Sequence, residues 1–125
     1  MTIQRALDLA DQMKPNMMQD ETKIQFLSEL EGIIFDELLM QHEHLLEEER
    51  NRIYDADTDR GTEMLAPAPY DMVYVYWLMG KIDLQNMEID KYNNDTALFN
   101  TAYETLSDWW TRNKMPIQKT REFRL

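Results

Sequence analysis

The strongest metal-binding pattern in this sequence is a run of aspartates at alternate positions, Asp55, Asp57 and Asp59, followed by Gly61. Alternating carboxylates are typical of calcium-binding loops. The run departs from the EF-hand pattern, because its glycine falls one place late and Ala66 stands where that pattern has a bidentate glutamate. We therefore interpret it as an acidic, solvated loop, and we predict no metal ion or other cofactor.

The two histidines, His42 and His44, are the other candidate metal ligands. On a helix, residues two positions apart point to different sides, whereas zinc-binding histidines on a helix lie four apart. The absence of cysteine excludes disulfides, a thiolate nucleophile and a cysteine-type zinc site, and it suits a reducing cytoplasm.

Other catalytic patterns are missing as well. None of the 24 acidic residues is placed by the sequence in an apolar pocket beside a second one, and no glycine-rich phosphate loop is found. We predict that the protein is not an enzyme. A metal-dependent enzyme using the carboxylates of Asp55 to Asp59 is the least favoured alternative.

Charge is distributed unevenly along the chain. The net charge is −11, and residues 116–125 hold Lys119, Arg121 and Arg124 against Glu122, so the remainder is strongly acidic. Such a body repels phosphate backbones and anionic lipids, and we predict no membrane binding and no sequence-specific nucleic-acid binding. An acidic body with a basic tail suits self-association or a protein partner.

The content of 3 Gly and 4 Pro disfavours an all-β fold, and helical spacing of apolar residues predicts an all-α bundle of three to four helices. Thr2 is expected to cap a first helix that ends before Lys14-Pro15-Asn16, and Asp20 to begin a second. The first stripe is Ile3, Ala6, Leu7 and Ala10, and the second is Leu27, Leu30, Ile34, Leu38 and Leu45.

A long acidic connection is expected over residues 47–68, with room for a short hairpin. Its part from Asp55 to Glu63 is predicted to be mobile. Pro69 is expected at the start of a third helix that runs to about Tyr92. This helix has two apolar stripes, so it needs two neighbours. One stripe is Tyr74, Leu78, Ile82, Ile89 and Tyr92, and the other is Val73, Trp77, Leu84 and Met87.

Asn93-Asn94-Asp95 is interpreted as a turn before a fourth helix, although the two could form one bent helix. The fourth stripe is Leu98, Phe99, Ala102, Leu106, Trp109 and Trp110, and we expect it to pack on the second helix. One Trp of the final pair is expected in the core and the other at an interface.

Residues 1–115 are thus predicted to form a single helical domain and residues 116–125 an extended basic tail. The predicted partner-binding residues are Tyr70, Trp77, Trp110, Lys119, Arg121, Phe123, Arg124 and Leu125.

Two groups of short strings resemble a known family. The first group comprises Lys14-Pro15-Asn16, Asp20-Glu21-Thr22-Lys23 and the run from Phe26 to Gly32. The second comprises the runs Leu65 to Asp71, Val75 to Leu78, Ile89 to Asn94, Ala97 to Asn100 and Asn113 to Pro116. These strings resemble the head-to-tail connector, or adaptor, proteins of long-tailed phages and prophages of Gram-positive bacteria.

The resemblance implies a helical subunit of the virion neck, assembled in the bacterial cytoplasm as a ring with portal and tail-completion proteins as partners. It implies a ring that lines or seals the DNA exit channel, and it brings no catalytic residue. The alternative is a small acidic protein that mimics DNA or acts as a regulatory protein-binding module, which would also explain the charge of −11.

Overall fold

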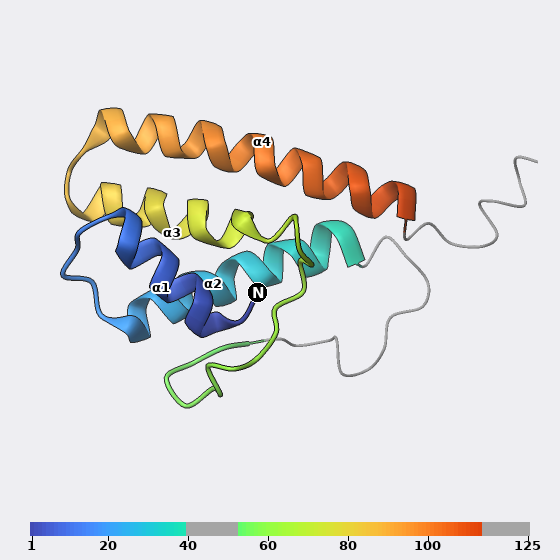
Figure 1. Cartoon of the computed structure of the whole chain (residues 1–125), viewed down its shortest axis with the longest axis horizontal. Coiled ribbons are helices and arrows are strands. Elements are labelled where there is room, and N and C mark those ends of the chain that lie inside the picture. Colours follow the sequence, from blue (N-terminus) through green and yellow to red (C-terminus); the bar gives the residue numbers. More distant parts are fainter. Residues whose placement is uncertain (40–52, 114–125) are drawn as a thin grey trace, which may run out of the picture.

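The computed structural model describes residues 1–39 and 53–113, which contain four α-helices (Figure 1). They are α1 (Ile3–Met13), α2 (Asp20–Ile34), α3 (Met72–Gln85) and α4 (Ile89–Asn113), and a π-helix, η1 (Phe35–Leu39), continues α2. Within the described ranges there is no β-strand, only an isolated bridge between Thr2 and Glu63. The all-α prediction is therefore confirmed for these ranges. Both histidines, Leu45 and the predicted tail lie outside the described residues.

The helices form layers, with α3 between α4 on one side and α1 and α2 on the other (Figure 1). α4 runs antiparallel to α3 and meets the second helix only at η1. The prediction that α4 packs along the second helix is therefore wrong for most of its length, because α3 separates the two. The pattern of one apolar stripe on each helix could not distinguish these two arrangements.

α3 is apolar on two sides, as predicted, and both sides find neighbours within the chain. Tyr74, Leu78 and Ile82 from one predicted stripe and Val73 from the other have no exposed surface. The predictions for Leu84, Met87 and Ile89 of these stripes are wrong, because α3 ends at Gln85 and these side chains are exposed. The contacts of α3 are made with α1, α2 and α4. The two-sided character of this helix therefore does not require a second copy of the chain.

The break between α3 and α4 lies several residues before the predicted one. α3 ends at Gln85, and Asn93-Asn94-Asp95, predicted as a turn, lies inside α4. The amide of Glu88 donates to the carbonyl of Asp83 at 2.9 Å, and the amide of Met87 donates to that of Leu84 at 3.1 Å. These bonds, with Met87 in the left-handed region at φ 58°, form a Schellman-type helix end.

The first two helices follow the sequence prediction closely. The Thr2 hydroxyl accepts a hydrogen bond from the Arg5 amide at 3.1 Å and so caps α1. Asn16 closes the loop to α2, because its amide group donates to the Lys14 carbonyl and its oxygen accepts from the Met18 amide. The predicted stripe residues of these helices are buried, namely Ile3, Ala6, Leu7, Ala10, Leu27, Leu30, Ile34 and Leu38.

Residues 53–71 wrap across α1 and α2 before α3 begins (Figure 1). This segment was predicted to be partly mobile, but backbone hydrogen bonds fasten it to the start of α1, from Ile3 to Thr62 at 3.2 Å and from Gln4 to Arg60 at 2.9 Å. The helix expected at Pro69 begins later, at Met72, because the Tyr70 amide closes a turn onto the Pro67 carbonyl.

No helix in the described ranges combines the length and apolarity needed to cross a membrane.

Candidate interaction site

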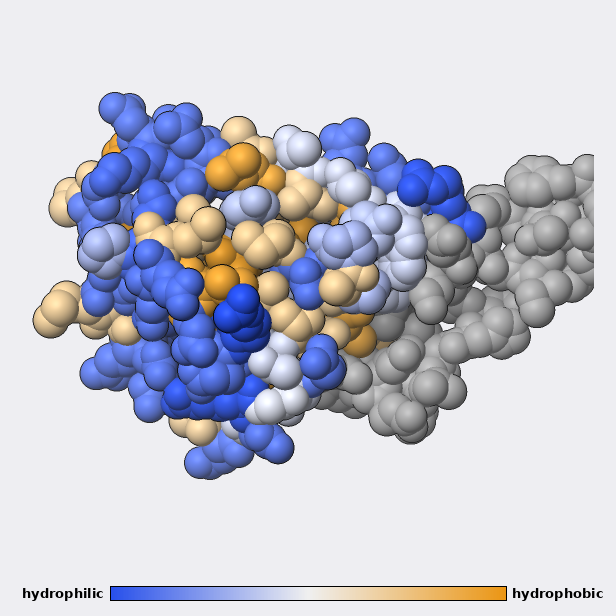
Figure 2. Space-filling model, in the orientation of Figure 1, coloured by the Kyte–Doolittle hydropathy of each residue, from blue (hydrophilic) through white to orange (hydrophobic). Residues whose placement is uncertain are grey.

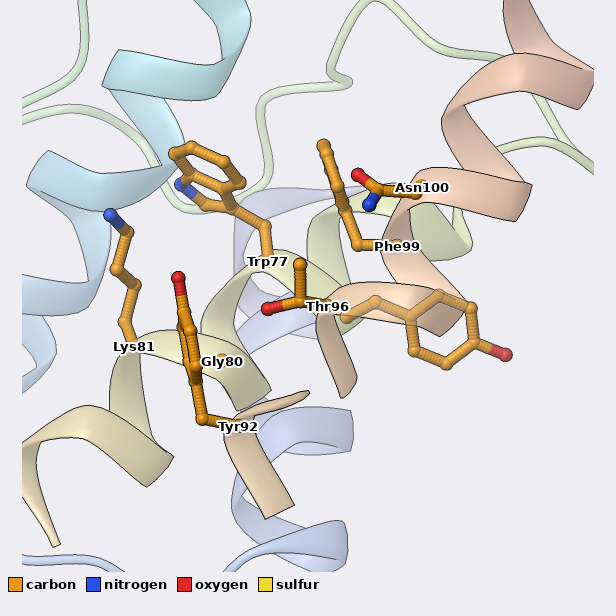
Figure 3. A pocket seen from close by; sticks show the side chains of 8 residues that line it. Trp77, Gly80, Lys81, Tyr92, Thr96, Phe99 and Asn100 are labelled. Atoms are coloured by element: carbon orange, nitrogen blue, oxygen red, sulfur yellow. The ribbon is translucent and has the colours of Figure 1, made fainter. Parts of the chain in front are cut away.

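An aromatic groove of about 130 Å³ lies between α3 and the first half of α4 (Figure 3). Helical spacing places Trp77 and Lys81 on one face of α3, and Tyr92, Thr96 and Phe99 on the facing side of α4. Eight residues line the groove, and they are Tyr76, Trp77, Gly80, Lys81, Tyr92, Thr96, Phe99 and Asn100.

The Tyr92 ring lies over Gly80 of α3. A Cβ atom at position 80 would be 3.8 Å from this ring, which is ordinary van der Waals contact, so the approach of the ring does not require a glycine. Across the groove, the rings of Trp77 and Phe99 lie with their centroids 5.1 Å apart. The Trp77 indole nitrogen donates to the Phe26 carbonyl at 2.8 Å, which fixes the orientation of the ring.

Lys81 supplies the positive charge of this site. Its ammonium nitrogen lies 4.5 Å from the centroid of the Trp77 ring and 5.2 Å from that of Phe26, which is cation–π geometry. A carboxylate oxygen of Glu29 lies 3.6 Å away and partly balances the charge. The site therefore combines aromatic walls with one held cation.

The groove is lined mainly by aromatic side chains, with Lys81 as its charged group. The eight lining residues include no carboxylate, histidine or cysteine, so the groove holds no pair of carboxylates and no thiol nucleophile. Aromatic walls, a hydroxyl and an amide suit an apolar or planar side chain of a protein partner.

Of the three aromatic residues predicted to bind a partner that lie in the described ranges, Tyr70, Trp77 and Trp110, only Trp77 lines the groove. Tyr70 stacks on Trp109 with the centroids 5.1 Å apart, and Trp109 meets Trp110 edge to face at 5.6 Å. Trp110 is the more buried of the Trp pair, with 7% of its surface exposed, because it lies one helical turn after the fully buried Leu106. Tyr70 and Trp110 are thus brought together around Trp109, and Trp77 contacts Phe99 instead.

The remaining residues predicted to bind a partner belong to the basic tail. Lys119, Arg121, Phe123, Arg124 and Leu125 lie outside the described residues.

In the acidic run, Asp55 and Asp59 accept hydrogen bonds from nearby backbone amides and so stabilise turns. No group of three or more His, Cys, Asp or Glu side chains in the described ranges is arranged to hold a metal ion.

A buried carboxylate, Glu31, joins three parts of the core. It has no exposed surface and accepts hydrogen bonds from the hydroxyls of Tyr54 and Tyr74, each at 2.5 Å, and from the Leu65 amide at 2.9 Å. The Tyr74 hydroxyl also accepts from the Ala66 amide at 2.8 Å. Burial, followed by the charge of Glu31, raises the pKa of Tyr74 well above its usual value. These bonds pin the wrapping segment to α2 and α3.

A second buried cluster joins α1, α3 and α4. The ammonium of Lys14 lies 3.1 Å from Oδ1 of Asp83 and 3.0 Å from Oδ2 of Asp95. Burial raises the pKa of Asp83 to about 6, and the neighbouring Asp95 acts in the same direction. Burial opposes the charge of Lys14, but hydrogen bonds to Asp95 and Asp83 raise its pKa. None of the three lines the groove, so we interpret the cluster as structural.

Sequence reasoning missed both buried clusters, although part of the signal was present. Glu31 falls on the same helical face as Leu27 and Ile34, where a carboxylate needs buried partners. Asp83 likewise follows the stripe residue Ile82 within an otherwise apolar helix. Neither position indicates which distant residue supplies the partner.

Comparison with known protein families, curated proteins and solved structures finds no match to this chain.

Proposed function

We propose that this protein is a structural subunit of the neck of a long-tailed phage. It would assemble in the host cytoplasm as a ring between the portal and the tail, and would help to line or seal the DNA exit channel. Its partners would be further copies of itself, the portal and the tail-completion proteins. The proposal rests on the sequence resemblance to head-to-tail connector proteins.

The position of the resembling strings in the fold is the observation that supports this proposal best. Lys14, from the string Lys14-Pro15-Asn16, joins three helices through Asp83 and Asp95. Glu31, which precedes Gly32 in another string, is the hydrogen-bonded centre of the core. Strings that resemble connector proteins thus supply contacts that stabilise this fold, as a fold shared with that family would require.

The surface chemistry is compatible with a neck subunit. A net charge of −11 gives a ring few cations with which to hold passing DNA, because binding to DNA is driven largely by the release of counterions from its phosphates. The aromatic groove beside Trp77 offers a docking place for an apolar side chain of a neighbour. Assembly would use such exposed surfaces, since both apolar sides of α3 are covered within the chain.

Deletion of the gene from a phage or prophage that carries it tests the proposal. We expect electron microscopy to show DNA-filled heads and free tails that fail to join, and we expect a copy of the gene supplied in trans to restore tailed particles. A normal yield of tailed particles without the protein would contradict the proposal. It would favour the DNA-mimic alternative, which is tested by competition with DNA for a nucleic-acid-binding enzyme.

A further inference from the structure

One end of the bundle carries most of the exposed apolar side chains. Of the seven large apolar side chains that are exposed in the described ranges, five lie near the α1–α2 loop and the α3–α4 turn. We call this surface the methionine end, formed by Met13, Met17, Leu84, Met87 and Ile89. Met17 is 95% exposed and Met87 84%, so these side chains add little to the stability of the subunit itself. Clustered apolar exposure of this kind indicates an interaction surface.

The two segments of the methionine end are held side by side. The Asn86 side chain donates to the Pro15 carbonyl at 3.2 Å, and Lys14 reaches across to Asp83 and Asp95. Figure 1 shows both loops at the same end of the bundle, and Figure 2 shows apolar side chains protruding there among hydrophilic ones. The surface is therefore one preformed patch.

The backbone of Met87 provides an independent observation. Its φ of 58° lies in the left-handed region, and its place in the helix end is the one that glycine usually occupies. Methionine is less favourable than glycine in this conformation. A contact of the exposed side chain outside the subunit would account for a methionine at this position.

Charge around the methionine end defines the partner. Residues 11–23 and 83–95 together hold seven acidic residues and three lysines. All three lysines are already engaged, Lys14 with two aspartates, Lys23 with Asp11 at 2.5 Å and Lys91 with Glu88 at 2.5 Å. The surface thus fits a cationic segment with apolar anchors, for which methionine side chains are adaptable contacts.

We propose that the methionine end binds the basic tail, residues 116–125, of a neighbouring copy of this chain. Phe123 and Leu125 would be the apolar anchors, and Lys119, Arg121 and Arg124 would face the surrounding carboxylates. This inference rests on the proposed ring and names the contact that builds it. Such a contact joins two different surfaces, and a head-to-tail contact of this kind closes into a ring when the rotation permits.

The length of the chain favours a neighbouring copy over the same chain. α4 has 25 residues and is therefore about 37 Å long, so Asn113 and Ile89 lie at opposite ends of it. The twelve residues from 114 to 125 span at most about 40–43 Å, so the tail reaches the methionine end of its own subunit only when it is almost fully extended. The tail of a neighbour is free of this limit.

The aromatic groove is the competing acceptor for the tail. Lys81 lies at the groove, however, and a single carboxylate, that of Glu29, balances its charge at 3.6 Å, whereas Lys14 at the methionine end faces two aspartates. Charge therefore favours the methionine end over the aromatic groove as the acceptor of the tail.

Cross-linking of full-length chains tests this contact, since the absence of cysteine lets each introduced thiol act alone. One chain carries Glu122→Cys, which keeps every tail cation and anchor, and is mixed with a second chain carrying Met17→Cys. A short bis-maleimide should join this pair about tenfold faster than it joins Glu122→Cys to Thr101→Cys on the exposed surface of α4. Equal rates would overturn the proposal, and so would faster joining to Asn100→Cys at the groove.

Two further variants separate docking from folding. A chain with both Glu122→Cys and Met17→Cys should cross-link between copies, and mainly intramolecular products would overturn the choice of a neighbour. Met87→Gly should slow the tail cross-link to Met17→Cys about tenfold while leaving the denaturation midpoint equal or higher, because glycine relieves the backbone strain. If Met87→Gly left the rate of this cross-link unchanged, the proposed contact of the tail with Met87 would be wrong. Failure of cross-linking leaves the neck role testable by the particle assay above.

Discussion

The ammonium nitrogen of Lys14 lies 3.1 Å from Oδ1 of Asp83, a carboxylate with no exposed surface. Asp95 approaches the same ammonium from α4, so one lysine at the end of α1 faces two buried acids from two other helices. Burying a carboxylate is unfavourable unless a cation or hydrogen bonds compensate it. Lys14 therefore compensates two buried carboxylates, one on α3 and one on α4.

Replacing Lys14 by Met tests that dependence. The variant keeps the length and apolar stem of the side chain but leaves Asp83 and Asp95 without their cation. Breaking a buried ion pair in this way is expected to lower the free energy of unfolding by about 3–5 kcal/mol at pH 7, measured by urea denaturation. Lys91→Met is the control, because the Lys91 side chain is 59% exposed and its ion pair with Glu88 should contribute far less to stability. Similar losses in the two variants would contradict the special role of Lys14.

The raised pKa of Asp83 predicts how stability changes with pH. Burial raises this pKa to about 6, so the folded protein binds the proton more tightly than the unfolded chain, whose aspartates titrate near 3.8. Protonation of Asp83 therefore favours the folded state, and this contribution is lost as the pH rises from about 4 to about 6. Its full size would be about 3 kcal/mol.

Asp83→Asn removes the titrating group while keeping the shape of the side chain. We expect the variant to have a higher free energy of unfolding than the wild type at pH 7 and a flatter pH dependence between about 4.5 and 6. Urea denaturation at several pH values in this window measures both effects, with the exposed Asp108→Asn on α4 as control. Parallel pH profiles for Asp83→Asn and the wild type would show that another group carries the dependence.

Tyr74→Phe tests the cluster around Glu31. The substitution removes the hydroxyl that donates to Glu31 and accepts from the Ala66 amide, so two buried polar groups each lose a partner. We expect the free energy of unfolding to fall by about 2–3 kcal/mol. Tyr76→Phe on the same helix is the matched control, since the Tyr76 ring is partly exposed and lines the groove. If Tyr74→Phe lowered the free energy of unfolding no more than Tyr76→Phe, the Tyr74 hydroxyl would not be a major contributor to stability.

Local signals explain what the sequence could predict. The Thr2 cap and the apolar spacing of the first two helices act over a few residues, and both predictions are confirmed. The turn at Asn86 to Glu88 gave no signal, because methionine stands where a glycine would have marked the helix end. Asn93-Asn94-Asp95 gave a false turn signal, because these residues lie inside α4 and Asp95 is buried against Lys14.

The candidate site shows the same limit. Trp77 was among the residues predicted to bind a partner, but Lys81, Tyr92 and Thr96 were not. Their role depends on which faces of α3 and α4 meet, and an apolar stripe is equally consistent with packing on either neighbour. The order of the layers is decided by tertiary contacts, so the groove could not be derived from spacing alone.

Leu106→Ala tests the placement of α4 against α3. Leu106 has no exposed surface, whereas Leu98 of the same predicted stripe is 47% exposed. Both variants shorten the same side chain within one helix, so helix propensity changes equally. We expect Leu106→Ala to lower the free energy of unfolding by about 2–5 kcal/mol, through lost burial and the cavity left behind. Leu98→Ala should lower it by about 1 kcal/mol or less, because that side chain already contacts water. Urea denaturation followed by Trp fluorescence compares them, and equal losses would mean that α4 is rotated from the orientation described.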